Sequence, residues 1–290
     1  MSTSPTSIPS NSTQSTHCSN DNVENANITF ESICTQISHQ VNAFLEDEAT
    51  TPLLRRVQAQ MRITLGVIHK ALKQYSLDEI SLSYNGGKDC LVLLILFLSA
   101  IATSGVGEPK TKQTLSSPIF SKSKISSLFP HRLHSVYVMA PHSFPEVDAF
   151  VTTSATAYGL DLVRYSLPLK AALTRYLEDN KVIKAIFVGT RRSDPHGKLL
   201  THFNETDNGW PSFMRVHPII DWSYSEIWAF ILHFRIPYCT LYDQGYTSLG
   251  GINDTHPNPA LRVDNLETYK PAYELSDDDA ERLGRNDYHE

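Results

Sequence analysis

The sequence predicts an α/β protein with a doubly wound, mainly parallel sheet and helices on both faces, in the Rossmann-like manner. Short apolar segments of strand length alternate with segments of helical periodicity. One of the strands, IKAIFV at 183–188, is apolar almost throughout, as strands inside a parallel sheet are. With 290 residues and 41% hydrophobic content, the chain is expected to form one main domain, which we place at residues 26–270.

The chain before the first strand divides into a tail and two helices. Residues 1–25 are rich in Ser, Thr, Asn and Pro, so we expect a disordered tail. Apolar residues then recur at helical spacing over 28–44 and 53–75. A half-buried strand is predicted at 80–84, and the apolar run at 90–101 predicts a buried helix that is too short to span a membrane.

The remaining elements continue the alternation. Strands are predicted at 134–139, 162–167 and 183–188, with helices at 145–158 and 168–178 between them. The segment 103–129 mixes Gly, Pro, Ser and Lys with little periodicity, so we expect a surface insertion there. A further helix follows 222, and its aromatic residues Trp222, Trp228 and Phe230 are expected in the core.

Composition and charge exclude several classes of function. A net charge of −6 argues against a nucleic-acid-binding surface. The cysteines at 18, 34, 90 and 239 show neither paired nor metal-ligand spacing, which indicates a reducing compartment. No window has about 18 consecutive apolar residues, and the first basic residue is Arg55, which argues against an Arg-rich presequence. We therefore expect a cytoplasmic protein without a membrane span.

The first candidate site is the turn NGGKD at 85–89, between the strand at 80–84 and the buried helix. Its two glycines allow the backbone to approach an anion, and the helix N-terminus and Lys88 add positive charge. An ordinary strand-to-helix turn is the alternative, because the string matches neither of the common phosphate-binding glycine motifs. If the turn is a phosphate site, Asn85→Ala and Asp89→Ala should lower turnover far more than stability.

A second cluster, GTRRSDPHG at 189–197, follows the strand at 183–188. Arg191 is suited to phosphate oxygens and Asp194 to Mg²⁺, although the alternative is a solvated turn whose charges pair with each other. In a doubly wound sheet, ligands bind beyond the carboxyl ends of the strands. Segments 84–89, 139–141 and 189–194 should therefore face one crevice.

Two further segments carry candidate ligand contacts. Trp210 lies in a loop beside Gly209 and Pro211, where its ring could stack on a flat ligand, the alternative being a loop anchor packed on the body. Near the end of the chain, DDDAERLGR at 277–285 places Arg282 and Arg285 three residues apart on a possible short helix. A solvated face is the alternative there.

Taken together, SYNGGKD, GTRRSDPHG, DNGWPSFMRVHPIIDW, IPYCTLYDQGYTSLGG, PNPAL and PAYELSDDDAERLGR resemble the eukaryotic FAD synthetase (FMN adenylyltransferase) family in its fungal form. This family belongs with the PAPS-reductase-like PP-loop proteins. The resemblance covers most of residues 80–285. The turn departs from the PP-loop signature S-G-G-K-D-S, with Asn85 and Cys90 in place of its two serines. The resemblance implies the substrates ATP and FMN, the cofactor Mg²⁺, and the products FAD and pyrophosphate.

The resemblance also implies roles for individual residues. ATP and pyrophosphate would contact Ser83, Tyr84, Asn85, Gly86, Gly87, Lys88, Asp89, Met139, Gly189 and Arg191. The isoalloxazine ring of FMN would contact Asp207, Trp210 and Arg215. Catalysis would fall to Asn85, Asp89, Asp194, Arg282 and Arg285, with Asp194 also a metal ligand and residues 271–290 reaching back to the active site. The FMN phosphate, already anionic at pH 7, would attack the α-phosphorus without a general base. We expect a monomer.

Two alternatives remain at this point. A PAPS reductase would share the fold but needs a nucleophilic cysteine in a C-terminal motif, whereas the last cysteine here, Cys239, lies in a Tyr-rich loop. A non-catalytic flavin- or nucleotide-binding module would keep Trp210 and the glycines but could lose the charged residues. The charged residues of all three clusters are present, which favours the enzyme.

Overall fold

The computed structural model describes residues 29–104, 132–263 and 268–286. The expected tail at 1–25 and nearly all of the expected insertion at 103–129 lie outside these ranges. Among the described residues, no helix is long and apolar enough to cross a bilayer.

A six-stranded sheet in the order β3-β2-β1-β4-β6-β5 forms the centre of the molecule. The pairs β1–β2, β1–β4, β2–β3 and β4–β6 are parallel, and β5 pairs with β6 in the antiparallel direction. The strands are β1 (Ile80–Ser83), β2 (Leu133–Val138), β3 (Leu160–Tyr165), β4 (Ala185–Phe187), β5 (Phe203–Glu205) and β6 (Met214–Val216). The predicted doubly wound sheet is confirmed. The hairpin β5–β6 was missed because each of its strands is only three residues long.

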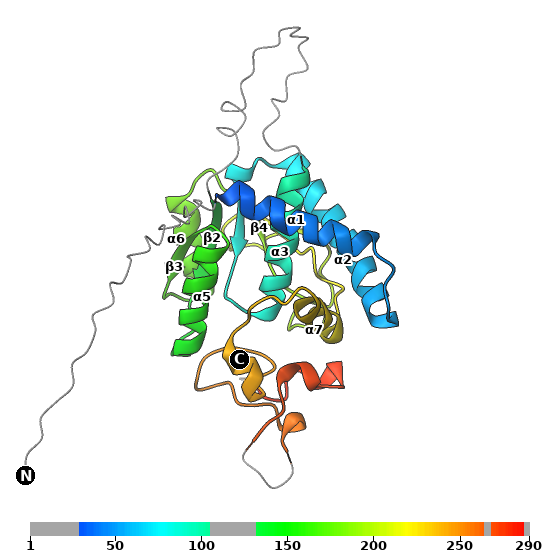
Figure 1. Ribbon diagram of the computed structural model, residues 1–290. Coiled ribbons are helices and arrows are strands. Elements are labelled where there is room, and N and C mark those ends of the chain that lie inside the picture. The colour runs from blue at the N-terminus through cyan, green and yellow to red at the C-terminus, as the bar shows by residue number, and fades with distance from the viewer. Residues whose placement is uncertain (1–28, 105–131, 264–267, 287–290) are drawn as a thin grey trace, which may run out of the picture.

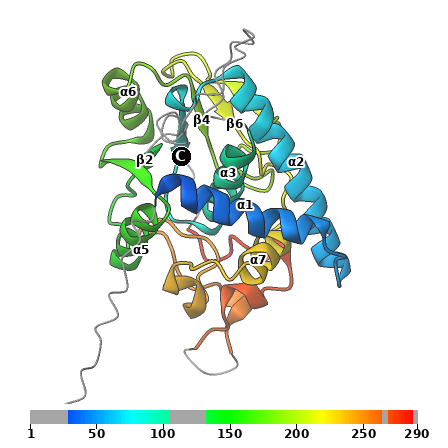
Figure 2. The ribbon, with the colours of Figure 1, turned by 45° about the horizontal axis from the view of Figure 1, so that its top comes forward.

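Helices cover both faces of the sheet (Figures 1 and 2). One face carries α1 (Phe30–Glu46), α2 (Pro52–Gln74), α3 (Lys88–Thr103), α5 (Pro145–Ala157) and α7 (Tyr224–His233), whose buried residues form one large apolar cluster. The other face carries α6 (Leu169–Asp179), which packs on Val136 and Ile186 in a smaller cluster. The predicted helices are present. Trp222, Trp228 and Phe230 are buried, as expected.

Helix α3 is the most deeply buried of these elements. Almost every residue from Cys90 to Ile101 is buried, and the helix contacts α1, α2 and α7. A helix that is apolar all round has to be enclosed by other elements, which fixes its axis. Its N-terminus, at Lys88, is thereby held at the carboxyl end of β1.

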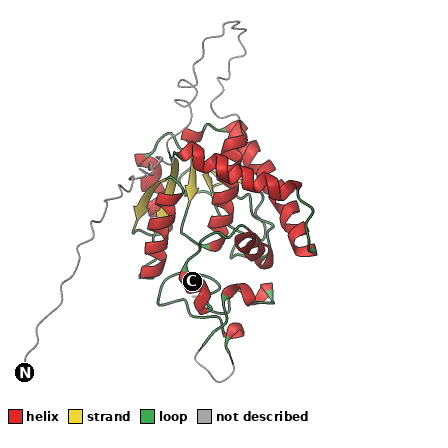
Figure 3. Ribbon diagram, viewed as in Figure 1, coloured by secondary structure: helices red, strands yellow, loops and turns green. Residues whose placement is uncertain are grey.

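The chain after α7 has little regular structure and gathers beyond the carboxyl ends of the strands, in the lower part of Figures 1 and 3. It contains four short 3₁₀ turns: η3 (Thr240–Gln244), η4 (Pro259–Leu261), η5 (Ala272–Glu274) and η6 (Asp278–Ala280). The possible short helix near the C-terminus is the single turn η6. Loops therefore enclose the edge of the sheet where ligands of this fold class bind.

Candidate active site

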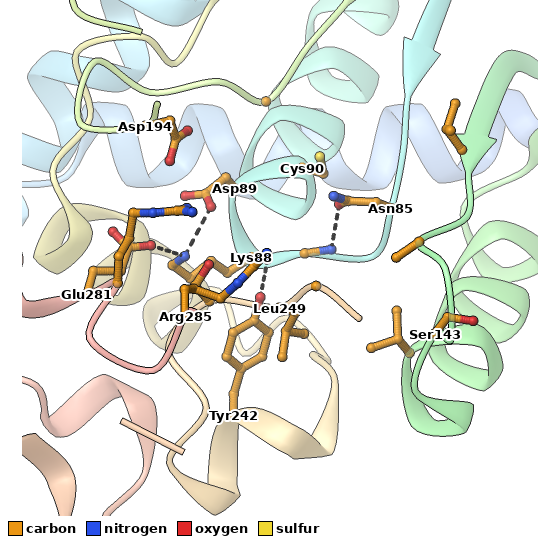
Figure 4. A pocket seen from close by; sticks show the side chains of 18 of the residues that line it. Asn85, Lys88, Asp89, Cys90, Ser143, Asp194, Tyr242, Leu249, Glu281 and Arg285 are labelled. Atoms are coloured by element: carbon orange, nitrogen blue, oxygen red, sulfur yellow. Dashed lines mark hydrogen bonds and ion pairs between the residues drawn. The ribbon is translucent and has the colours of Figure 1, made fainter. Parts of the chain in front are cut away.

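A cavity of about 230 Å³ opens at the carboxyl ends of β1, β2 and β4 (Figure 4). It lies where the strand order reverses between β1 and β4, the switch point at which open α/β sheets bind ligands. All five residues expected to act in catalysis line it: Asn85, Asp89, Asp194, Arg282 and Arg285. The structure thus brings together three clusters that lie far apart in the sequence.

The turn between β1 and α3 presents backbone to this cavity. Gly86 has φ of 71°, and a Cβ atom there would lie 2.8 Å from Val151 Cγ2, so the position requires glycine. The Gly87 N–H donates to Asn85 Oδ1 at 2.9 Å, and the Lys88 N–H donates to the hydroxyl of Tyr242 at 2.9 Å. Two amides at the N-terminus of α3 are therefore already held by neutral acceptors.

Four buried or partly buried charges form a closed network beside the turn. Lys88 Nζ lies 3.1 Å from Asp89 Oδ2 and 2.5 Å from Glu281 Oε1. Arg191 Nε lies 2.7 Å from Asp89 Oδ1, and Arg191 Nη2 bonds Glu281 Oε2. Lys88 is 2% exposed and Arg191 is 1% exposed. Each cation contacts both carboxylates, so the charge of the network is balanced internally.

The pKa shifts follow from this pairing. Burial by itself lowers the pKa of Lys88, but the carboxylates of Asp89 and Glu281 outweigh it and raise the pKa to about 12. Burial raises the pKa of Asp89, but Arg191 and Lys88 outweigh this and hold it below its usual value. Lys88 and Asp89 are therefore both charged at neutral pH.

Asp194 has a different environment in the same cavity. Its Oδ2 accepts the backbone N–H of Arg191 at 2.8 Å. Burial raises the pKa of Asp194, and the charge of Asp89 raises it further. A carboxylate with a raised pKa gains when a cation approaches. The described residues hold no cluster of three or more metal-binding side chains, yet Mg²⁺ commonly uses one or two carboxylates together with substrate phosphates. Asp194 fits that pattern.

The C-terminal segment supplies the cavity's two arginines. Arg282 and Arg285 line it, and Arg285 Nη2 lies 3.7 Å from Asp254 Oδ1. A Cβ atom at Gly250 would lie 2.5 Å from Arg285 Nη2, so the absence of a side chain at Gly250 leaves the space that the guanidinium occupies. Figure 4 shows Arg285 beside Lys88 and Leu249.

Several residues expected to bind ATP lie outside the cavity. Tyr84 is fully buried, and its hydroxyl donates to Ser154 Oγ at 2.8 Å. Arg191 is occupied by Asp89 and Glu281 instead of facing the cavity. Ser83, Gly86 and Met139 are not among its lining residues, although Asn85, Gly87, Lys88, Asp89 and Gly189 are. The solvated-turn alternative for 189–197 does not describe Arg191, because its side chain is buried and pairs with carboxylates outside the segment.

The three residues expected to hold the flavin lie apart from the cavity, on the hairpin β5–β6 at the edge of the sheet. Arg215 Nη2 donates to the carbonyl of Glu205 at 2.9 Å and lies 3.5 Å from Asp207 Oδ2. The Asp207 side chain is 77% exposed. Trp210 is 38% exposed, so it is only partly packed on the body of the protein. The hairpin therefore brings these residues together without enclosing them.

Glu281 and Tyr242 are among the residues of the cavity that were not predicted from the sequence. Glu281 joins Lys88 to Arg191, and Tyr242 accepts the Lys88 N–H. Tyr242 belongs to the Tyr-rich loop at 237–251. Glu281 directly precedes Arg282, but only the two arginines of that segment were predicted as site residues. Cys239 is 1% exposed, and burial raises the pKa of its thiol, which disfavours the thiolate that a reductase needs.

Comparison with known proteins shows the family of the chain. A family model for the phosphoadenosine phosphosulfate reductase domain matches residues 79–173 and 167–257. The chain is 40% identical over 251 residues to a probable FAD synthase of Schizosaccharomyces pombe, covering 87% of this chain and 88% of that protein.

Two solved structures are also similar. One is Candida glabrata FMN adenylyltransferase in complex with FAD and inorganic pyrophosphate, with a TM-score of 0.80, 27% identity, and coverage of 89% of this chain and 99% of that one. The other is the same enzyme with FMN and the ATP analogue AMPCPP, with a TM-score of 0.78, 26% identity, and coverage of 89% and 100%. The chain therefore belongs to the FAD synthase (FMN adenylyltransferase) family within the phosphoadenosine phosphosulfate reductase domain family, as its motifs predicted.

Proposed function

We propose that this protein transfers AMP from ATP to FMN and releases pyrophosphate. The observation that carries the proposal is the meeting of the glycine turn, Asp194 and the pair Arg282 and Arg285 in one cavity. The related Candida glabrata enzyme has been solved with FAD and pyrophosphate, which are the products of this reaction.

In the proposed step, an oxygen of the FMN phosphate forms a bond to the α-phosphorus of ATP. The bond between the α-phosphorus and the bridging oxygen breaks, and pyrophosphate leaves with that oxygen. The attacking phosphate is already an anion at pH 7, so no group has to remove a proton from it. In keeping with this, the described lining of the cavity includes no histidine. The protein would contribute alignment and charge neutralisation.

The charge balance of the site divides these tasks among its cations. Lys88 and Arg191 are each held by Asp89 and Glu281, so little of their charge is left for a ligand. We assign neutralisation of the phosphates to Arg282 and Arg285, to which the N-terminus of α3 adds partial positive charge. Asp194 would hold Mg²⁺, which when bound supplies positive charge to the ATP phosphates. This places Arg191 behind the site, where it supports Asp89, instead of in contact with phosphate.

The cavity also suggests where the two rings lie. Val138, Ala140 and Ser143 line the side formed by the end of β2, and we place adenine there in preference to the buried Tyr84. The isoalloxazine ring would lie on the hairpin side with Asp207, Trp210 and Arg215. FMN would then extend from the hairpin, with its phosphate pointing into the cavity.

We also infer a monomer in the cytoplasm. The described cysteines Cys34, Cys90 and Cys239 are free thiols, which fits a reducing compartment. Size-exclusion chromatography with light scattering tests the monomer, and a dimer mass would contradict it.

The activity is tested by incubating the purified protein with Mg-ATP and FMN and following FAD and pyrophosphate. Both products should appear in equal amounts, and chelation of Mg²⁺ should stop their formation. Riboflavin should not replace FMN, because it lacks the attacking phosphate. Formation of no FAD, or conversion of riboflavin at a comparable rate, would contradict the assignment.

A further inference from the structure

The side chain of Glu281, in the C-terminal segment 277–285, bonds the glycine turn at 85–89. Its two carboxylate oxygens bond different cations, Lys88 at the start of α3 and Arg191 in the loop after β4. The residue is 6% exposed. Figure 4 shows it beside Lys88, opposite Asp89. One buried carboxylate therefore ties three separate parts of the chain together.

The backbone of Glu281 is fixed as well. Its carbonyl accepts the hydroxyl of Thr247 at 2.6 Å, and the carbonyl of the preceding Ala280 accepts Asn258 Nδ2 at 2.8 Å. Thr247 and Asn258 are buried and bond each other at 2.9 Å. The only regular structure in this segment is the three-residue turn η6. Polar anchors, more than a helical apolar face, therefore determine where the segment lies.

Loss of the Glu281 carboxylate would affect the arginines next to it. Lys88 and Arg191 would then share Asp89 alone, and an uncompensated positive charge would remain buried beside Arg282 and Arg285. Like charges at this range repel, and the segment would lose its strongest side-chain anchor. Both effects move the arginine pair away from the phosphate cavity.

We propose that Glu281 is a positioning residue for adenylyl transfer, which holds Arg282 and Arg285 at the cavity by bonding Lys88 and Arg191. This inference rests on the proposed function for the role of the two arginines. Glu281 itself is not expected to touch a substrate, because its oxygens are occupied by the two cations.

The test compares Glu281→Gln with Asp278→Asn, a matched loss of a carboxylate in the same segment. Asp278 accepts the N–H and hydroxyl of Ser225 at 3.2 Å each, away from the cavity. In Glu281→Gln, we expect kcat and the affinity for pyrophosphate to fall by about tenfold or more, with FMN affinity changed much less. Asp278→Asn should retain both values within about threefold.

A second variant displaces Arg285 without touching Lys88 or Arg191. Gly250→Ala places a Cβ atom where the flexible end of Arg285 lies, so the guanidinium should move while the fold is kept. It should give the same loss of kcat and pyrophosphate affinity as Glu281→Gln. Gly250→Ala also tests the proposal if Glu281→Gln fails to fold. If Gly250→Ala binds pyrophosphate normally, the position of Arg285 does not matter for binding, and the proposed role of Glu281 is contradicted.

The proposal is overturned if folded Glu281→Gln keeps normal kcat and pyrophosphate affinity, or if Asp278→Asn loses as much. A purely structural role predicts a lower melting temperature with normal constants for the folded fraction. Absence of FAD formation by the unmodified protein would instead count against the proposed function. Pyrophosphate affinity is measured by calorimetric titration, which needs no turnover, so the comparison of Glu281→Gln with the unmodified protein still tests the role of Glu281.

Discussion

The glycine turn at 85–89 and the hairpin β5–β6 differ in how far their charged side chains are buried. At the turn, Lys88 and Arg191 are almost fully buried, and each contacts both Asp89 and Glu281. On the hairpin, the Asp207 side chain is 77% exposed and lies 3.5 Å from Arg215 Nη2. The first region is fixed before any ligand arrives, whereas the second still has groups in contact with water.

The two regions are therefore expected to contribute differently to the free energy of unfolding and to ligand affinity. Buried charges are expensive to leave unpaired, so the turn contributes to folding as well as to chemistry. Exposed groups contribute little to stability and can pair with a ligand when it excludes water. Substitutions at the turn should therefore affect both stability and activity, while substitutions on the hairpin should affect binding alone.

The largest expected effect is that of Asp89→Ala. Its removal leaves Lys88 and Arg191 with one carboxylate between them, and breaking a buried pair typically costs about 3–5 kcal/mol. Because the Asp89 side chain is still 19% exposed, we expect the lower end of that range. Urea unfolding gives the loss of stability, and FAD formation should fall with it.

The matched control is Asp221→Ala, which breaks an ion pair with Arg192 whose side chains are 42% and 43% exposed. Such surface pairs contribute about 0–1 kcal/mol. Equal destabilisation by the two substitutions would break the comparison, because it would show that burial of the network adds nothing.

The effect of Asp89 on stability could not be predicted from the sequence. From the sequence, Asp89 was expected to affect turnover far more than stability because it follows a strand-end turn. In the structure Arg191, which lies 102 positions further along the chain, contacts Asp89, and Glu281, which lies 192 positions further along, pairs with the same two cations as Asp89. No local pattern reports such a contact. Loop position alone is therefore a poor guide to the energetic role of a charged residue.

Other parts of the molecule were readable because their signals are local. Alternation in β1, helical spacing in α1 and α2, and the apolar run of α3 each depend on neighbouring residues. The expectation that β1 is half-buried was wrong, because Ser81 is fully buried and its hydroxyl accepts the Tyr176 hydroxyl at 2.8 Å. The hairpin β5–β6 was missed because its three-residue strands are stabilised by pairing, β5 with β6 and β6 with β4. Family motifs indicated the clusters that line the cavity, but they could not distinguish Arg191, which is buried, from Arg282 and Arg285, which line it.

A second expected effect concerns pH and tests whether the hairpin edge holds a buried charge. His217 directly follows β6, is 2% exposed, and has no hydrogen-bond partner for its ring nitrogens among the described residues. Burial, with smaller contributions from Arg215 and His202, lowers its pKa from 6.5 to about 4. Between these pH values the unfolded chain binds the proton and the folded chain does not, so stability falls as pH decreases.

His217→Asn should remove this part of the acid destabilisation, which amounts to roughly 3 kcal/mol, since each pKa unit corresponds to about 1.4 kcal/mol. The measurement is urea unfolding of both proteins at several pH values from 7 to about 4. His39→Asn, at an exposed position on α1, is the control for the loss of an imidazole. Parallel curves for the unmodified protein and His217→Asn would show that the imidazole is protonated in the fold, and the hairpin edge would then hold a buried charge.

The smallest expected effect is that of Trp210→Ala on FMN affinity, and it tests directly whether the hairpin binds a ligand without contributing to stability. Trp210 is 38% exposed, so Trp210→Ala should change the melting temperature little. If its ring stacks on the isoalloxazine, the substitution removes an aromatic contact worth about 1 kcal/mol in addition to its buried apolar area. FMN affinity should then fall by about tenfold or more, since 1.4 kcal/mol corresponds to a factor of ten. Affinity for an unreactive ATP analogue should stay within about twofold, because adenine is assigned to the end of β2.

Calorimetric titration of Trp210→Ala with FMN, and separately with the ATP analogue, decides between stacking and a loop anchor. Leu199→Ala removes an apolar side chain that is 89% exposed and should change neither affinity. An anchor predicts a clearly lower melting temperature and similar losses for the two ligands, because the whole hairpin would shift. That result would show that substitutions on the hairpin, like those at the glycine turn, change stability and binding together. A selective loss of FMN affinity at unchanged melting temperature would instead show that the Trp210 side chain acts by contacting the isoalloxazine ring.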